Sequence, residues 1–233
     1  AAELALREIL KRDPEHREAH NNLSVLLARQ STPVSSGAVS KTSASLLEQY
    51  QLACSHPSDL QMHLPWLSEL ALGCEHITDL GTGEGLAALA FLTAQPQKLI
   101  CVDLEAHPRW DLLKSVCGKT DLVLINDSSL TVDLEETDLL LIDTWQVEQQ
   151  LRAELSRHAD KVRKYLIIHG TTTYAEQGES PGHGGLESVL EDLLAQGRFQ
   201  IDHQRSEGHG FTVLSRISSV VEPGQAPQSV PQP

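Results

Sequence analysis

The stretch with the most specific chemistry is residues 77–85, ITDLGTGEG. An apolar run leads into it and an apolar helical pattern follows it, so a predicted strand ends where a predicted helix begins. Glycines at such a junction let the backbone approach a ligand closely, and the helix N-terminus offers free N–H groups. The pattern therefore predicts a turn that binds a nucleotide-type ligand.

The spacing of the glycines separates two classes of nucleotide ligand. The dinucleotide fingerprint G-x-G-x-x-G needs a glycine at position 86, where this chain has Leu86. The spacing is instead D-x-G-x-G-x-G from Asp79, which resembles motif I of class I S-adenosylmethionine-dependent methyltransferases. A NAD-dependent dehydrogenase is the disfavoured alternative. The resemblance implies S-adenosylmethionine as cofactor, bound by Asp79, Gly81, Thr82, Gly83, Glu84 and Gly85.

Two further positions fit a bound nucleoside. Asp103 ends the next predicted strand, where both nucleotide-binding families place an acidic residue on the ribose hydroxyls. After the third predicted strand comes Asn126-Asp127-Ser128-Ser129. The methyltransferase resemblance implies that this loop contacts adenine through Asp127 and Ser128.

The fourth predicted strand ends in LLLIDTW, and an aspartate at the place of Asp143 faces the methyl group in many members of the family. Over residues 57–217 the chain resembles the bacterial branch called cephalosporin hydroxylase-like or catechol O-methyltransferase-like. The segments that carry this likeness are LLLIDTWQVEQQL, VRKYLIIHGTTTY and GHGFTVLSR. The likeness implies methyl transfer to an oxygen of a small-molecule or glycan acceptor.

The chain departs from that branch at three places. One is the usual serine-like residue after the third glycine, which residues 86–88 (LAA) replace, and the other two lie on the acceptor side. Metal-dependent members hold Mg²⁺ through the strand-four aspartate and a second carboxylate after strand five, where this chain has Gly170. A basic residue three positions after the aspartate is replaced by Gln146, which cannot accept a proton. We therefore expect a metal-independent protein, and we expect Gly170→Asp to create metal binding.

Histidines and aromatics near these strand ends leave alternatives open. His169 is a candidate catalytic base beside Asp143, or a strand-end histidine bonded to backbone. A zinc site from three histidines, His169, His183 and His209, is a disfavoured alternative. Trp145 and Tyr174 either wall the acceptor pocket or simply pack.

These residues need a scaffold in which parallel strands end at one edge of a sheet. The chain alternates short apolar runs with helical patterns, which predicts an α/β fold. We expect a doubly wound, mostly parallel, seven-stranded sheet, Rossmann-like and preceded by a short all-α helical hairpin. The predicted strands are 76–80, 98–102, 121–125, 138–142, 163–168, 198–204 and 210–217. The predicted helices are 44–55, 60–73, 84–94, 109–117, 145–160 and 186–196.

The chain divides into four parts by composition. Residues 1–30 resemble the junction of two tetratricopeptide repeats, although a plain helical hairpin fits equally well, and we expect a possible protein partner there. Residues 31–43 read as a linker and residues 44–217 as the methyltransferase-like domain. Residues 218–233 are rich in Pro, Gln and Ser, which predicts a disordered tail.

Charge and hydropathy argue against nucleic-acid-binding and membrane proteins. Lys and Arg number 18 against 32 Asp and Glu, a net charge of −14, so a nucleic-acid partner is not expected. No apolar run reaches about 18 residues and no apolar leader opens the chain, so we expect no membrane partner. Four widely spaced cysteines without a CxxC indicate reduced thiols in a cytoplasmic protein.

Two hypotheses follow for function. In the first, the chain is an enzyme in which Asp143 lies at the reacting end and His169 acts as the base. In the second, it is a catalytically lapsed S-adenosylmethionine-binding module that acts in protein assembly through its N-terminal segment. The replacements at Gly170 and Gln146 favour the second, and the intact glycine turn favours retained cofactor binding.

Overall fold

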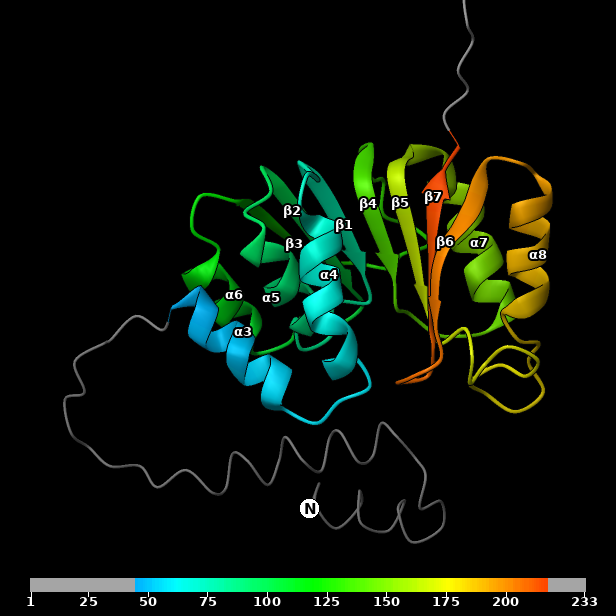
Figure 1. Cartoon of the computed structure of the whole chain (residues 1–233), viewed down its shortest axis with the longest axis horizontal. Coiled ribbons are helices and arrows are strands. Elements are labelled where there is room, and N and C mark those ends of the chain that lie inside the picture. The colour runs from blue at the N-terminus through cyan, green and yellow to red at the C-terminus, as the bar shows by residue number, and fades with distance from the viewer. Residues whose placement is uncertain (1–44, 218–233) are drawn as a thin grey trace, which may run out of the picture. The chain divides into compact units, whose positions relative to one another are not determined.

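The computed structural model describes residues 45–217; the expected hairpin, linker and tail lie outside them. The predicted α/β order is confirmed for this part of the chain (Figure 1). The helices are α3 Leu46–Ser55, α4 Leu64–Ala71, α5 Leu86–Thr93, α6 Trp110–Val116, α7 Glu148–His158 and α8 Glu187–Ala195, with short 3-10 turns η1 Gln61–His63 and η2 Ala159–Lys161. The strands are β1 His76–Leu80, β2 Lys98–Asp103, β3 Asp121–Asn126, β4 Thr137–Ile142, β5 Val162–His169, β6 Phe199–Arg205 and β7 Phe211–Arg216.

The seven strands form one sheet in the order β3-β2-β1-β4-β5-β7-β6. All neighbours are parallel except β7, which runs antiparallel to both β5 and β6. Strand β1 pairs with β2 on one side and β4 on the other, so the strand order reverses there. In open α/β sheets, ligands bind at the carboxyl ends of the strands beside such a reversal.

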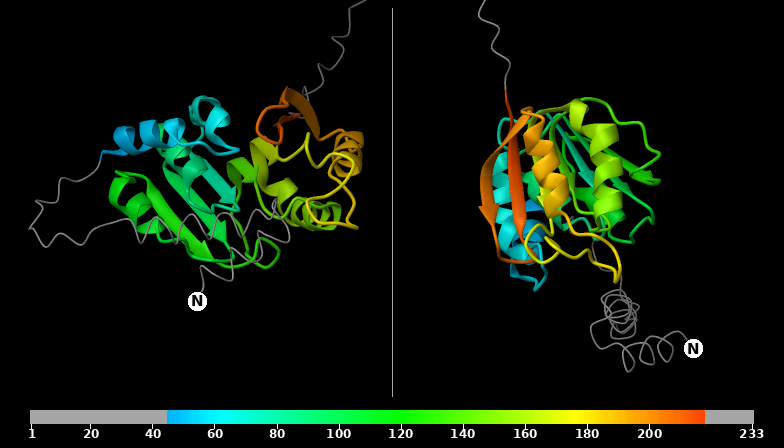
Figure 2. Two further views of the ribbon diagram at one scale, coloured as in Figure 1. Left: turned by 90° about the horizontal axis from the view of Figure 1, so that it is seen from below. Right: turned by 90° about the vertical axis from the view of Figure 1, so that its right-hand side faces the viewer.

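Two hydrophobic layers cover the sheet, because alternate side chains of each strand point to opposite faces. On one face, Ile77, Leu99 and Leu139 pack with α3, α4, α5 and α6. On the other, Leu80 and Ile142 pack with α7 and α8. Figure 2 shows the two helical layers on either side of the strands. Because the central strands are buried on both faces, they read as continuous apolar runs.

Two predicted helices have different boundaries in the structure. The prediction for 60–73 is wrong in detail: η1 comes first, and α4 starts at Leu64 with Pro65 in its first turn, where proline is tolerated. The prediction for 145–160 starts too early, because α7 begins at Glu148. The backbone of Gln146 instead bonds to the Glu179 amide nitrogen, a tertiary contact that no helical period reveals.

Two further observations concern the described residues as a whole. All four cysteines are free thiols, with Cys74 and Cys101 buried. No helix between residues 45 and 217 is long and apolar enough to span a bilayer.

Candidate functional site

The glycine turn joins β1 to α5 in a conformation that other residues rarely adopt. Gly81 has φ +86°, and a Cβ there would overlap the backbone carbonyl of Asp143. Gly85 has φ +81°, and a Cβ there would come 2.7 Å from Leu113 Cδ1. Gly83 is exposed, with φ +50°, and a Cβ there would meet almost nothing within 4 Å. Two glycines are therefore required by packing, whereas Gly83 borders open space.

Asp103, at the end of β2, binds this turn directly. Its Oδ2 accepts a hydrogen bond from the Gly83 amide nitrogen at 2.7 Å, and its Oδ1 accepts one from the Glu105 amide at 3.2 Å. The far side of the turn is held by Trp110, whose Nε1 donates to the Gly83 carbonyl oxygen at 3.1 Å. Glu84 pairs with Arg109 at 3.1 Å. The carboxyl ends of β1 and β2 are thus joined through predicted site residues.

Asp79 lies fully buried at the end of β1. Neither of its carboxylate oxygens has a hydrogen-bond partner among the described residues, since the nearby Thr82 hydroxyl donates to the Asp79 carbonyl oxygen at 3.1 Å. Burial, together with the negative charges of Asp143 and Asp103, raises the pKa of this carboxyl to about 8. The free protein therefore keeps this carboxyl protonated up to about pH 8, and a bound cation would stabilise its ionised form.

The loop after β3 is ordered by its own side chains. Asp127 Oδ1 accepts hydrogen bonds from the Ser128 amide and from the Thr131 hydroxyl, both at 2.7 Å, and these bonds lower the pKa of Asp127. Asn126 Nδ2 donates to the carbonyl oxygens of Asp103 and Leu104. The loop proposed for adenine is therefore fastened to the end of β2, beside the glycine turn.

Asp143, at the end of β4, belongs to a buried polar group that the sequence indicated only in part. Its Oδ1 lies 2.7 Å from His169 Nδ1 and accepts a hydrogen bond from Gln146 Nε2 at 3.0 Å. The His169 Nε2 lies 2.8 Å from the Gly208 carbonyl oxygen, in the loop between β6 and β7. The Asp143 side chain is 14% exposed and that of His169 is fully buried. Asp143 is thus the member of the pair that reaches the surface.

Both ring nitrogens of His169 have hydrogen-bond partners inside the fold. Nδ1 lies 2.7 Å from Asp143 Oδ1 and 3.2 Å from Gln146 Nε2, and Nε2 lies 2.8 Å from the Gly208 carbonyl oxygen. Burial by itself lowers the pKa of His169, but the Asp143 carboxylate and the Gly208 carbonyl outweigh it and raise the pKa. This arrangement favours the backbone-bonded alternative over the base, because both ring nitrogens are engaged within the fold and the side chain is fully buried.

The expectation for Gly170→Asp meets a steric obstacle. Gly170 has φ +83°, and a Cβ there would overlap the side-chain oxygen of Gln146. A carboxylate at this position therefore cannot be added without moving the group around Asp143. The three-histidine zinc alternative is wrong: no set of three or more His, Cys, Asp or Glu within residues 45–217 could hold a metal. His183 and His209 instead contact Gln149 and Thr173.

Trp145 and Tyr174 differ in their exposure and in their contacts. Trp145 is 44% exposed and donates a hydrogen bond from Nε1 to the Ser180 hydroxyl at 3.0 Å. Tyr174 is half-buried and stacks on His209 with ring centroids 5.5 Å apart. Trp145 therefore presents an aromatic surface two residues from Asp143, and Tyr174 packs.

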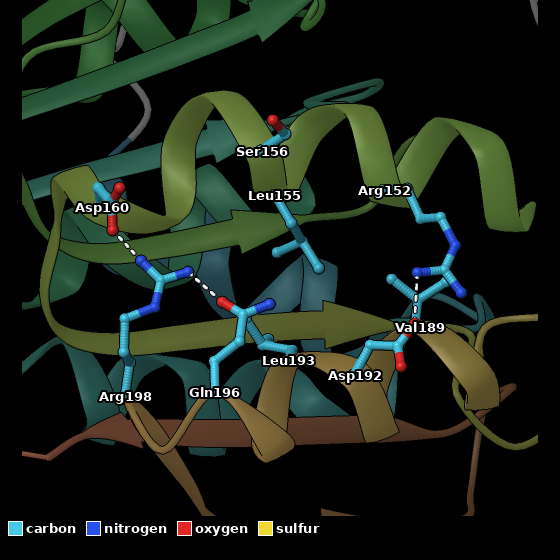
Figure 3. A pocket seen from close by; sticks show the side chains of 9 residues that line it. All are labelled: Arg152, Leu155, Ser156, Asp160, Val189, Asp192, Leu193, Gln196 and Arg198. Carbon is cyan, nitrogen blue, oxygen red and sulfur yellow. Dashed lines mark hydrogen bonds and ion pairs between the residues drawn. The ribbon is translucent and has the colours of Figure 1, made fainter.

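A separate hollow of about 320 Å³ lies between α7 and α8 (Figure 3). Arg152 pairs with Asp192 at 2.7 Å on one wall, and Arg198 pairs with Asp160 on another. None of the predicted site residues lines it. Its residues are Arg152, Leu155, Ser156, Asp160, Val189, Asp192, Leu193, Gln196 and Arg198.

Comparison with known proteins supports the predicted fold. No protein-family model and no curated protein matches the sequence. Among solved structures, an O-methyltransferase from Bacillus cereus in complex with S-adenosylhomocysteine has a TM-score of 0.56 and 15% identity, over 77% of this chain and 93% of that one. A Podospora anserina methyltransferase bound to S-adenosylhomocysteine has a TM-score of 0.53 and 12% identity, over 87% and 97%. The chain thus has the Rossmann-like methyltransferase fold.

The acceptors of such neighbours differ from one another. The 1,6-didemethyltoxoflavin-N1-methyltransferase of Burkholderia thailandensis, with bound 1,6-didemethyltoxoflavin and S-adenosylhomocysteine, has a TM-score of 0.52 and 16% identity, over 74% of this chain and 88% of that one. It acts on nitrogen, whereas the Bacillus cereus protein is an O-methyltransferase. The shared fold therefore leaves the acceptor to be argued from the site.

Proposed function

We propose that this chain binds S-adenosylmethionine at the carboxyl ends of β1, β2 and β4 and transfers its methyl group to an oxygen of a small-molecule or glycan acceptor. One observation carries the proposal: the glycine turn lies against the ends of β2 and β4. Asp103 accepts a hydrogen bond from the Gly83 amide, and a Cβ on Gly81 would overlap the Asp143 carbonyl. Bound S-adenosylmethionine supplies a methyl group on a positively charged sulfur.

The residues present fit this cofactor. Its ammonium and sulfonium groups are cations that would stabilise the ionised form of Asp79, a buried carboxyl group without a hydrogen-bond partner in the described residues. Its ribose diol suits Asp103, an acceptor at the open edge of the turn. A dinucleotide fits less well, because Leu86 is buried in the first turn of α5 where the fingerprint requires glycine. Asp127 and Ser128 lie in a loop fastened beside this turn and would contact the adenine.

On the acceptor side, the chain orients and polarises rather than abstracting a proton through His169. Asp143 is the carboxylate proposed to contact the acceptor hydroxyl and to receive its proton when the acceptor oxygen takes the methyl group. His169 and Gln146 act through Asp143 as positioning residues, since both are buried and bonded to its Oδ1. Holding two reactants in productive geometry supplies much of a rate enhancement by itself.

The test begins with calorimetry using S-adenosylmethionine, S-adenosylhomocysteine and NAD. We expect dissociation constants in the micromolar range for the first two, about −8 kcal/mol of binding free energy, and no binding of NAD. Saturable NAD binding without S-adenosylmethionine binding would overturn the proposal. Formation of S-adenosylhomocysteine is then followed with a panel of catechols and sugars, with Asp143→Asn as the variant expected to lose transfer while retaining cofactor affinity.

A second candidate is the lapsed cofactor-binding module, with residues 1–30 contacting a protein partner. It is favoured by the engagement of Asp143 Oδ1 with two buried groups, which restrains this oxygen from taking a proton. Tight S-adenosylmethionine binding with no transfer to any acceptor of the panel would favour this candidate over the enzyme.

A further inference from the structure

The inner face of α7 carries a buried carboxylate that none of the roles above uses. Glu154 is 1% exposed, and its Oε1 accepts three hydrogen bonds. They come from the Ser129 hydroxyl at 2.5 Å, the Thr144 hydroxyl at 2.7 Å and the Gln150 side-chain nitrogen at 2.7 Å. Three donors from three segments therefore converge on one oxygen atom.

Two of these donors lie next to residues of the proposed cofactor site. Ser129 follows Asp127 and Ser128 in the loop after β3, and Thr144 follows Asp143 at the end of β4. Glu154 thus connects the loop proposed for adenine to the strand end proposed for methyl transfer. It also lines, with Thr144, a small cavity of about 10 Å³ that His169 and Gln146 share.

One helical turn further along α7, His158 holds the same serine by its backbone. The His158 Nε2 donates to the Ser129 carbonyl oxygen at 2.7 Å, and burial lowers the pKa of this histidine. Gln150 donates to the Ser129 hydroxyl at 3.1 Å. Ser129 is therefore fastened to α7 through both its side chain and its main chain, although it belongs to a loop.

A buried carboxylate is a poor means of adding stability. Burial raises the pKa of Glu154 against the effect of its three hydrogen bonds, and its Oε2 has no hydrogen-bond partner in residues 45–217. An apolar side chain of similar size would fill this space at a lower desolvation cost. The carboxylate instead provides one fixed acceptor oxygen, and this oxygen determines the positions of the three donor side chains.

We propose that Glu154 is a positioning residue that holds the loop after β3 and the end of β4 in the geometry needed to bind S-adenosylmethionine. This inference rests on the proposed function. It predicts that breaking the Glu154 cluster weakens cofactor binding without any contact between Glu154 and the cofactor.

The experiment compares Glu154→Leu, Glu154→Gln and Ser129→Ala by calorimetry with S-adenosylhomocysteine. We expect about tenfold weaker binding for Glu154→Leu and about threefold for Ser129→Ala, sizes typical of coupled hydrogen-bond networks. Glu154→Gln keeps an acceptor oxygen and should bind within about threefold of wild type. The double variant Glu154→Leu/Ser129→Ala should be no weaker than Glu154→Leu alone.

Leu155→Ala is the matched control, because Leu155 is the next residue of α7, is buried and belongs to the apolar cluster. It should lower the melting temperature while leaving the dissociation constant unchanged. Affinity equal to wild type in both Glu154→Leu and Ser129→Ala would overturn the inference while leaving the proposed function intact. If Glu154→Leu fails to fold, Ser129→Ala decides by itself. Failure of the wild-type protein to bind S-adenosylhomocysteine would overturn both.

Discussion

Asp79 is the residue whose titration should be visible in the stability of the whole protein. The unfolded chain ionises this carboxyl near pH 3.8, whereas the folded chain keeps its proton up to about pH 8. The folded state therefore binds more protons between these values, and stability falls as pH rises through this window. The slope from this single group is at most about 1.4 kcal/mol per pH unit.

Asp79→Asn should remove this slope. We expect the variant to gain stability relative to wild type as pH rises from 5 to 8, because the amide carries no charge to bury. Urea denaturation at pH 5, 6.5 and 8 measures the difference, with exposed Asp111→Asn as the control. Parallel pH profiles for wild type and Asp79→Asn would contradict the buried, unpartnered carboxylate. The variant should also lose affinity for S-adenosylmethionine.

Asp103 should matter for the ligand far more than for the fold. Asp103→Ala removes the proposed acceptor of the ribose hydroxyls, so we expect binding of S-adenosylhomocysteine to weaken by about 1.5–3 kcal/mol. The melting temperature without ligand should change little, since the side chain is half-exposed and makes two backbone contacts in the described residues. Calorimetry and thermal denaturation separate the two effects. As a control, Asp111→Ala removes a negative charge from α6 and should change neither the dissociation constant nor the melting temperature. An unchanged dissociation constant for Asp103→Ala would show that the ribose is held elsewhere.

At the scale of the elements, alanine substitutions in the turn between β1 and α5 distinguish glycines needed for packing from a glycine needed for ligand binding. Gly73, Gly81 and Gly83 all have positive φ, so alanine costs each about 1–2 kcal/mol. Gly73→Ala has no further cost because nothing lies within 4 Å of the added Cβ. Gly81→Ala should lower the melting temperature well beyond Gly73→Ala, because its Cβ overlaps the Asp143 backbone.

Gly83→Ala should resemble Gly73→Ala in melting temperature and differ from it in ligand binding. Its Cβ points into open space in the free protein, where the proposed cofactor approaches the backbone. We expect Gly83→Ala to lose S-adenosylhomocysteine affinity at least tenfold, and Gly73→Ala to keep it. Equal affinity in the two variants would place the ligand away from this turn.

The prediction of metal independence rests on the residues at the ends of β4 and β5. Mg²⁺ needs several oxygen ligands, whereas Asp143 Oδ1 is already bonded to His169 and Gln146. We expect EDTA to leave cofactor binding and any methyl transfer unchanged, and added Mg²⁺ or Mn²⁺ to have no effect. Activity lost in EDTA and restored by Mg²⁺ would contradict this prediction. Gly170→Asp, with its strained φ and overlap with Gln146, should now be expected to destabilise the protein rather than to create a metal site.

At the scale of the whole molecule, charge bears on the choice of partner. The net charge of −14 arises entirely from residues 31–233, because residues 1–30 hold five basic and five acidic side chains. Such a chain has too few cations to neutralise a phosphate backbone. We expect dissociation constants weaker than about 100 µM for a single-stranded RNA and a DNA duplex at 150 mM salt. Fluorescence anisotropy measures this, and micromolar binding that weakens steeply with salt would contradict it.

Local patterns in the sequence were sufficient to predict the scaffold and to place the proposed cofactor-side residues at the ends of strands. The central strands are buried on both faces, so their apolar runs identify them without knowledge of their neighbours. The glycine turn and Asp103 could be predicted because each lies at the end of a strand, and parallel strands bring their carboxyl ends to one edge. The positive φ of Gly81 and Gly85 agrees with their place in that pattern.

Only the tertiary structure showed how the buried polar side chains near the proposed acceptor site pair with one another. The partners of His169 are Gln146 and Asp143 on one side and Gly208 on the other, the last 39 residues away in the chain. The helical spacing from Leu151 to His158 places Glu154 on the buried face of α7, but it does not reveal that Glu154 bonds to Ser129, 25 residues away. Residue spacing predicts which face of an element is buried, but the pairing of buried polar groups depends on how separate elements pack. The sequence by itself therefore determined the fold and the proposed cofactor end, and packing determined that His169 is bonded on both ring nitrogens.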